Sequence, residues 1–190
     1  MIKKLDRNPP KVINVETIAK TRIFEIERLE LQFSNGVETQ FERLRSSPYG
    51  AVLVVPMLDN ETVLLIREYA AGVERYELAL PKGRIEKNED PLVAANREIM
   101  EEIGYGSNKL KHIHSFSIAP GYLSHVTHII LAQDLFRQKE QGDEPEEIEV
   151  IPWKLSKLND LLKDPECSEA RSIAALFMVK EKLQTLTDKL

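Results

Sequence analysis

Residues 83–105 read GRIEKNEDPLVAANREIMEEIGY, the stretch with the most regular spacing of glycine, arginine and glutamate in the 190-residue chain. Asp90-Pro91 is a favourable N-cap and first-turn pair, and Gly104 is a favourable residue for a helix end. The stretch therefore predicts a structured turn after Gly83, followed by a helix over LVAANREIMEEI that ends at Gly104.

Glutamates on this helix are spaced so that their carboxylates share one face, because Glu98 lies three residues before Glu101 and four before Glu102. Clustered negative charge costs stability, and a hard divalent cation such as Mg2+ or Mn2+, which prefers oxygen ligands, would compensate for it. A solvated acidic helix face is the alternative. Gly83 and Gly104 lie near the two ends of this stretch and Glu89 lies between them, which favours a metal site over a solvated helix face.

Arg97 is placed to support such a site. It follows Glu89 by eight residues and precedes Glu101 by four, so its guanidinium can hold carboxylates in orientation. We expect it to orient ligands rather than to react.

Composition limits the classes of partner. The chain is 42% hydrophobic with a net charge of −5, which suits one globular domain with a small appended layer and offers no basic excess for a nucleic acid. The single Cys167 cannot form an intrachain disulfide, and no apolar run approaches the ~20 residues of a membrane span. We expect a cytoplasmic protein without a nucleic-acid or membrane partner.

Residues 1–47 predict a small antiparallel β-sheet. Apolar residues alternate at Leu29, Leu31 and Phe33 and lead into Asn35-Gly36, a hairpin signal. Three strands are stable only when packed on something else, which the main domain or a second subunit could supply.

Residues 48–190 predict a domain of strands and helices. Buried strands are expected in AVLVVPML (51–58), TVLLIREYA (62–70), YELAL (76–80), LKHIHSFSIA (110–119) and HVTHIILAQDL (125–135). RQKEQGDEPEEIEV (137–150) is typical of an acidic loop. LSKLNDLLK (155–163) and SEARSIAALFMVKEKLQ (168–184) show helical spacing, with Pro165 between them.

The pattern G-x5-E-x7-R-E-I-x-E-E-x-G-Y resembles the Nudix box, with Tyr105 where the family usually has an aliphatic residue. The resemblance implies an α/β fold, an α/β/α Nudix sandwich with a mixed sheet, here with the small N-terminal antiparallel sheet added. It also implies metal-dependent attack of water on a pyrophosphate.

INVETIAKTRIF, LQFSNGV, IREYAAG, GDEPE and EARSIAALF extend the likeness to the NudE-type ADP-compounds hydrolases. That resemblance implies cleavage of ADP-ribose, NADH and diadenosine polyphosphates to AMP and a second phosphate product, usually by a homodimer. Another nucleotide sugar, such as a GDP-sugar, is the alternative substrate. A non-catalytic nucleotide sensor is a third possibility, although no box glutamate is missing.

The resemblance also implies roles for single residues. Glu98, Glu102 and the backbone carbonyl of Lys82 match metal ligands. The base that takes a proton from water matches either a box glutamate, Glu101, or a loop acid, Glu144 or Glu146, and the loop acids have a plain alternative as solvated side chains.

Substrate contacts are implied at Arg43, with Glu42 beside it, and at Arg67, since bidentate guanidinium contacts suit a diphosphate. Tyr122 lies near the sequence position at which diadenosine-polyphosphate hydrolases carry a tyrosine, which implies that it stacks on a base; packing against a neighbour within a strand is the alternative. The sequence departs from relatives at residues 68–70, where Glu-Tyr-Ala replaces a Q-[YF]-R element, so one substrate arginine is displaced or missing.

Overall fold

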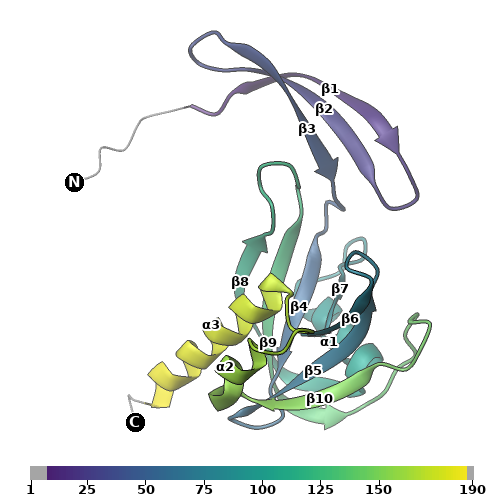
Figure 1. The fold of residues 1–190 in the computed structure, drawn as a ribbon, viewed down its shortest axis with the longest axis vertical. Helices are drawn as coiled ribbons and strands as arrows, with labels where there is room; N and C mark the ends of the chain where they lie inside the picture. Colours follow the sequence, from purple (N-terminus) through teal and green to yellow (C-terminus); the bar gives the residue numbers. More distant parts are fainter. Residues whose placement is uncertain (1–7, 188–190) are drawn as a thin grey trace. The chain divides into compact units, whose positions relative to one another are not determined.

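The computed structural model describes residues 8–187 and divides the chain into two units (Figure 1). The first unit contains the chain up to Pro48 together with Ser117–His125, and the second contains Tyr49–Phe116 and the chain from Val126 onward. Within the described residues, no helix is both long and apolar enough to cross a membrane.

The first unit is built on strands β1 (Lys11–Lys20), β2 (Glu25–Gln32) and β3 (Glu38–Arg45), an antiparallel sheet in that order. At the β2–β3 turn, Gly36 has a φ of 83°, a conformation that glycine adopts at least cost, and Asn35 Oδ1 accepts a 3.1 Å hydrogen bond from the Val37 N–H. The predicted hairpin and small N-terminal sheet are confirmed.

A segment from the middle of the chain belongs to the same unit. Leu123 forms a parallel bridge with Leu44, and the Leu44 N–H donates a 2.7 Å hydrogen bond to the Tyr122 carbonyl. The Ser46 N–H also donates to Ser124 Oγ at 3.1 Å. The N-terminal sheet is therefore paired with residues that lie some eighty positions later in the sequence.

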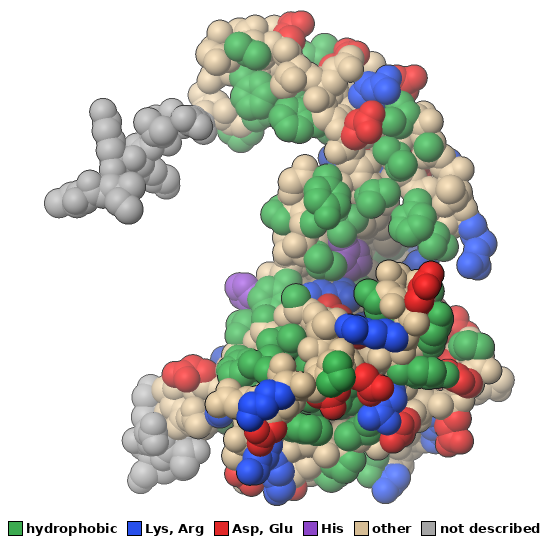
Figure 2. Space-filling model, viewed as in Figure 1, with side chains coloured by type: hydrophobic (Ala, Val, Ile, Leu, Met, Phe, Trp, Pro, Cys, Tyr) green, Lys and Arg blue, Asp and Glu red, His purple; other side chains and the backbone are tan. Residues whose placement is uncertain are grey.

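Few apolar side chains of this unit are enclosed. Leu29 is buried, whereas large apolar side chains of β1 and of the turn after it are exposed: Val12, Ile13, Val15, Ile23 and Phe24. Figure 2 shows hydrophobic side chains gathered on this unit. An exposed apolar sheet face of this kind usually packs on another surface.

The second unit contains two sheets, ordered β7-β4-β9-β8 and β10-β5-β6. Strand β4 is antiparallel to β7 and parallel to β9, so its sheet is mixed. The strands are β4 (Ala51–Pro56), β5 (Thr62–Ala70), β6 (Arg75–Ala79), β7 (Lys82–Arg84), β8 (Tyr105–Ser117), β9 (Val126–Arg137) and β10 (Glu149–Lys154).

Helices cover both faces of β4. The helices are α1 (Pro91–Ile103), the 3-10 helix η1 (Leu155–Lys157), α2 (Leu158–Leu161) and α3 (Ala170–Thr187). Val52 and Val54 pack in one core cluster with Ile99 of α1, while Leu53 and Val55 pack in the other with Leu176 of α3. These layers confirm the α/β/α sandwich. Residues 155–163 form only η1 and the short α2 rather than one continuous helix.

Glu169 caps the N-terminus of α3. Its Oε2 accepts hydrogen bonds from the Ser172 N–H (2.8 Å) and hydroxyl (2.7 Å), and its Oε1 accepts one from Arg171 Nε (2.6 Å). Burial alone would raise the pKa of Glu169, but these donors and the Arg171 charge lower it. The ionised Glu169 cap therefore stabilises the fold at pH values above the pKa of this group in the unfolded chain, near 4.5. This stabilisation is lost as the pH falls through the lower pKa of Glu169 in the folded chain.

Substituting Glu169→Ala should lower the free energy of unfolding by about 1 kcal/mol at neutral pH, because the cap is removed. The difference from wild type should shrink as the pH is lowered and vanish below the folded pKa of Glu169, where the wild-type carboxyl group is protonated as well. Urea unfolding at neutral pH and at a series of acidic pH values measures it, with Glu181→Ala, an exposed position on the same helix, as control. A deficit that persists unchanged in acid would show that packing rather than the charged cap is responsible.

Candidate active site

The turn and helix over residues 83–104 have the boundaries that the sequence predicts. The Asp90 side chain accepts a 2.8 Å hydrogen bond from the Leu92 N–H, with Pro91 in the first turn. Gly104 ends the helix with a φ of 72°, and its N–H donates to the Ile99 carbonyl. The glutamates of α1 are therefore held at fixed positions along one helix.

Glu98 and Glu102 are buried, at 8% and 4% exposure. Gly83 makes room for the first of them, since a Cβ at that position would lie 1.9 Å from Glu98 Cδ. The Lys82 N–H donates a 3.1 Å hydrogen bond to Glu102 Oε2. The short strand β7 thus lies directly against both carboxylates, which explains why a glycine is needed there.

Arg97 joins the turn to the helix. Its Nε donates to Glu89 Oε1 at 3.0 Å, and its Nη1 donates to Glu98 Oε1 at 2.7 Å and to Glu101 Oε2 at 3.0 Å. Nη2 donates to the Arg84 carbonyl at 3.0 Å. The hydrogen bond from Arg97 lowers the pKa of Glu89, and Glu89 and Glu98 raise the pKa of Arg97. The predicted orienting geometry is present.

The buried carboxylates form an excess of negative charge. Burial raises the pKa of Glu102 to about 8, with Lys82 opposing the shift and the charges of Glu98 and Glu68 adding to it. Burial also raises the pKa of Glu98, and Glu101 and Glu144 contribute to that rise.

This donor set fits a hard divalent cation, because it consists of buried carboxylate oxygens with too few positive charges among them. Within residues 8–187, no three acidic, histidine or cysteine side chains already converge as a metal-ligand set. Arg97 engages one oxygen of each of two acids, Glu98 Oε1 and Glu101 Oε2.

The two loop acids among the candidate bases have different surroundings. The Glu144 carboxylate lies over Gly142, where a Cβ would be 2.0 Å from Glu144 Oε2, and its charge acts on Glu98. Glu146 Oε1 instead accepts a 2.8 Å hydrogen bond from the Tyr76 hydroxyl. The sequence alone did not distinguish Glu144 from Glu146, whereas their contacts in the structure do.

Arg67 and its neighbour Glu68 face opposite sides of β5. Arg67 is paired with Glu149 and, at 2.8 Å, with Glu166. Glu68 accepts a 2.7 Å hydrogen bond from Lys82 Nζ and raises the pKa of Glu102. Sequence reasoning chose Arg67 and missed the Glu68–Lys82 pair on the box side, although strand alternation requires one of the two side chains to point there.

Glu42, Arg43 and Tyr122 come together in the first unit. They line a cleft of about 220 Å3, which Leu29, Leu31, Phe41, Pro120, Gly121, Leu123 and Ser124 complete. Arg43 is held by Glu27, with Nε–Oε2 at 2.8 Å, and Tyr122 is 59% exposed. The sequence-predicted substrate residues of this unit are thus neighbours in space.

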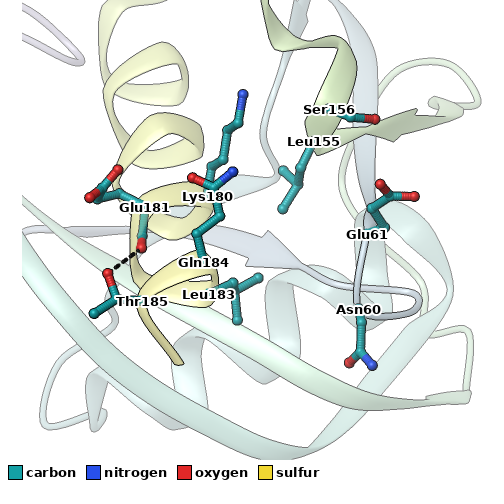
Figure 3. Close-up of a pocket in the computed structure, with 9 residues that line it drawn as sticks. All are labelled: Asn60, Glu61, Leu155, Ser156, Lys180, Glu181, Leu183, Gln184 and Thr185. Carbon is teal, nitrogen blue, oxygen red and sulfur yellow. Dashed lines mark hydrogen bonds between the residues drawn. The ribbon is translucent and has the colours of Figure 1, made fainter. Parts of the chain in front are cut away.

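A separate cavity of about 550 Å3 lies between the β4–β5 turn, η1 and α3 (Figure 3). Its lining includes Glu61 and Glu181, and Lys180 is its one basic residue. No residue of the box lines it, and its charges are not suited to an anionic substrate.

Comparison with known proteins agrees with this geometry. Residues 48–177 match the NUDIX domain, and residues 10–43 match the NudE-type Nudix hydrolase N-terminal domain. The chain is 46% identical over 175 residues to the ADP compounds hydrolase NudE of Escherichia coli (strain K12), covering 92% of this chain and 94% of that protein.

It is also 31% identical to the ADP-ribose pyrophosphatase of Bacillus subtilis (strain 168), covering 92% of this chain and 98% of that one. A crystal structure of an ADP compounds hydrolase superposes with a TM-score of 0.89 at 44% identity, covering 96% of this chain and 98% of that chain. With its box carboxylates buried beside Gly83 and held by Arg97, the chain belongs to the Nudix hydrolase family and carries the N-terminal domain of the NudE type.

Proposed function

We propose that the protein is a metal-dependent pyrophosphohydrolase that cleaves ADP-linked compounds, among them ADP-ribose, NADH and diadenosine polyphosphates, to AMP and a second phosphate product. The burial of Glu98 and Glu102 against the backbone of Lys82 and Gly83 carries this proposal. The likeness to an ADP compounds hydrolase and to an ADP-ribose pyrophosphatase supports the choice of substrate class.

Glu98, Glu102 and the Lys82 carbonyl would hold the metal ion, for which Mg2+ is the first choice and Mn2+ the second. When bound, a divalent cation would neutralise phosphate charge and make an adjacent water more acidic. Arg97 keeps Glu101 and Glu89 in place around this group through its bonds to both. The side chain of Lys82, paired with Glu68, supplies positive charge close to Glu102.

Glu144 is the proposed general base. It takes a proton from the attacking water, whose oxygen forms a bond to phosphorus while the bond from phosphorus to the bridging oxygen breaks, and the leaving phosphate departs with the electron pair. Glu144 is favoured over Glu146 because its charge acts on Glu98, whereas Glu146 is occupied by Tyr76. Glu101 is less suited, since Arg97 holds its carboxylate.

The cleft of the first unit is the proposed site for the nucleoside. Tyr122 and Phe41 are aromatic surfaces on which a base can stack, and Arg43 is a cation for phosphate or ribose oxygens. Arg67 would contact a diphosphate only by exchanging Glu149 and Glu166 for phosphate oxygens.

A GDP-sugar is the competing substrate, while the complete set of box acids argues against a sensor without activity.

We also propose a homodimer located in the cytoplasm. The exposed apolar side chains of β1 and its following turn support the dimer, because they need a partner surface. The single cysteine, Cys167, is buried as a free thiol, which suits a reducing compartment.

Incubation with Mg2+ and each of ADP-ribose, NADH and diadenosine triphosphate should release AMP, measured by chromatography of the products. An equal concentration of a GDP-sugar should give a kcat/KM at least about tenfold lower, because substrates are discriminated by differential contacts in the transition state. A higher value for the GDP-sugar would move the assignment to that substrate, and no turnover of any adenine compound would overturn it.

The variant Glu102→Gln should lose at least about 100-fold in kcat, since even residues that only support a metal ligand are worth 10–100-fold. Mg2+ should raise the melting temperature of wild type and should no longer raise that of the variant, because a metal ligand is gone. Glu86→Gln, an exposed acid in the preceding turn, is the matched control. A Glu102→Gln protein with wild-type kcat and an intact Mg2+ response would place the metal elsewhere.

Light scattering after size exclusion should give about twice the 21.8 kDa chain mass. The double substitution Ile13→Glu and Val15→Glu puts two charges on the exposed apolar face of β1 and should shift the mass toward that of one chain. A wild-type mass of one chain, or a dimer indifferent to both charges, would contradict this assignment.

A further inference from the structure

Tyr76 makes a bond that the proposed reaction does not use. This residue lies on β6, and its hydroxyl donates a 2.8 Å hydrogen bond to Glu146 Oε1, seventy residues later in the chain. Its ring packs edge-on against Tyr69 of β5, with centroids 5.7 Å apart and an interplanar angle of 73°. Both rings are partly exposed, so burial alone does not explain the bond.

The bond reaches the irregular segment 141–148 between β9 and β10. The approach to this segment is fixed on the end of α1. There the Gln138 N–H donates to the Gly104 carbonyl (3.1 Å), the Glu140 N–H to the Met100 carbonyl (3.1 Å), and Lys139 Nζ to the Glu101 carbonyl (2.5 Å). The far end enters β10, whose first residue, Glu149, pairs with Arg67 of β5. The segment is thus anchored at both ends, and Tyr76 holds it in between.

Within the segment, Glu144 and Glu146 are separated by Pro145. The proline ring restricts rotation of the backbone between them, so fixing one carboxylate limits where the other can lie. Gly142 leaves the space that the Glu144 carboxylate occupies, and the charge of Glu144 acts on Glu98 in the box. The residues just before Glu144 are thus anchored on the box helix α1, while Glu146 is held by Tyr76.

We propose that Tyr76 is a positioning residue of the catalytic loop: by holding Glu146, its hydroxyl keeps Glu144 in place to accept the proton of the attacking water. The proposal rests on the assignment of Glu144 as the base under the proposed function. Glu146 is then a tether that needs only an acceptor oxygen, whereas Glu144 needs a titratable carboxylate.

Because Glu144 must titrate and Glu146 must only accept a hydrogen bond, substitutions at the two positions should have different effects on kcat. Glu144→Gln should lose about 10²–10⁴ in kcat, because an amide cannot act as a base. Glu146→Ala and Tyr76→Phe should each lower kcat about tenfold with KM nearly unchanged, since they displace the base without removing it. Glu146→Gln keeps an acceptor for the Tyr76 hydroxyl and should recover most of the kcat lost in Glu146→Ala.

Two further measurements test the link itself. The double variant Tyr76→Phe with Glu146→Ala should be no slower than either single variant, because both changes break the same bond. Amide hydrogen exchange of residues 141–147 should quicken in Tyr76→Phe. Tyr69→Phe, which removes a hydroxyl from the same hairpin and keeps the ring, and Glu147→Gln, which removes an exposed charge from the same loop, are the matched controls.

A Glu146→Gln protein as inactive as Glu144→Gln would make Glu146 the base and overturn the proposal. A Tyr76→Phe protein with wild-type kcat and wild-type exchange would also overturn it. If wild type failed on every ADP-linked substrate, the proposed function would fall instead. In that case, faster amide hydrogen exchange of residues 141–147 in Tyr76→Phe would still support the role of Tyr76 in holding the loop. Unchanged exchange would refute that role.

Discussion

The guanidinium of Arg97 is the contact on which the site depends. It binds the end of β7 through the Arg84 carbonyl, the following turn through Glu89, and the helix through Glu98 and Glu101. A lysine could not replace it, because one ammonium cannot serve acceptors in so many directions. This contact keeps the carboxylates of α1 close together despite their repulsion. It also keeps the residues after β7 close to α1, so that Gly83 lies directly beside the Glu98 carboxylate.

That arrangement explains why a destabilising cluster persists in a small α/β sandwich. Glu98 and Glu102 are among the buried charged residues of the described chain, and burial raises the pKa of both. Carboxyl groups whose pKa is shifted by burial and by neighbouring charges are typical of functional sites. Here the short strand β7 (Lys82–Arg84) and the helix α1, which is capped by Asp90 and Gly104, hold these groups in place.

Local sequence was sufficient wherever the deciding interactions are local. Asp90 and Gly104 mark the ends of α1, and helical spacing places Glu98 and Glu102 together, without knowledge of any distant residue. It was insufficient for Arg67 and Glu68. Residues 62–66 of β5 are buried on both faces, so alternation of apolar and polar residues does not reveal which face meets the helix. The Tyr76–Glu146 bond and the pairing of Leu44 with Leu123 depend on strands and loops brought together by the whole fold.

The Leu44–Leu123 bridge means that the first unit is not a contiguous stretch of sequence. Residues 10–43 match an N-terminal domain, yet the unit that forms around them also takes in Ser117–His125, an excursion between β8 and β9 of the hydrolase. The edge of the sheet at β3 therefore depends on both pieces. N-terminal strands transplanted alone onto another protein would form a sheet whose third strand lacked this neighbour, so we expect a transplanted domain to need the β8–β9 excursion as well.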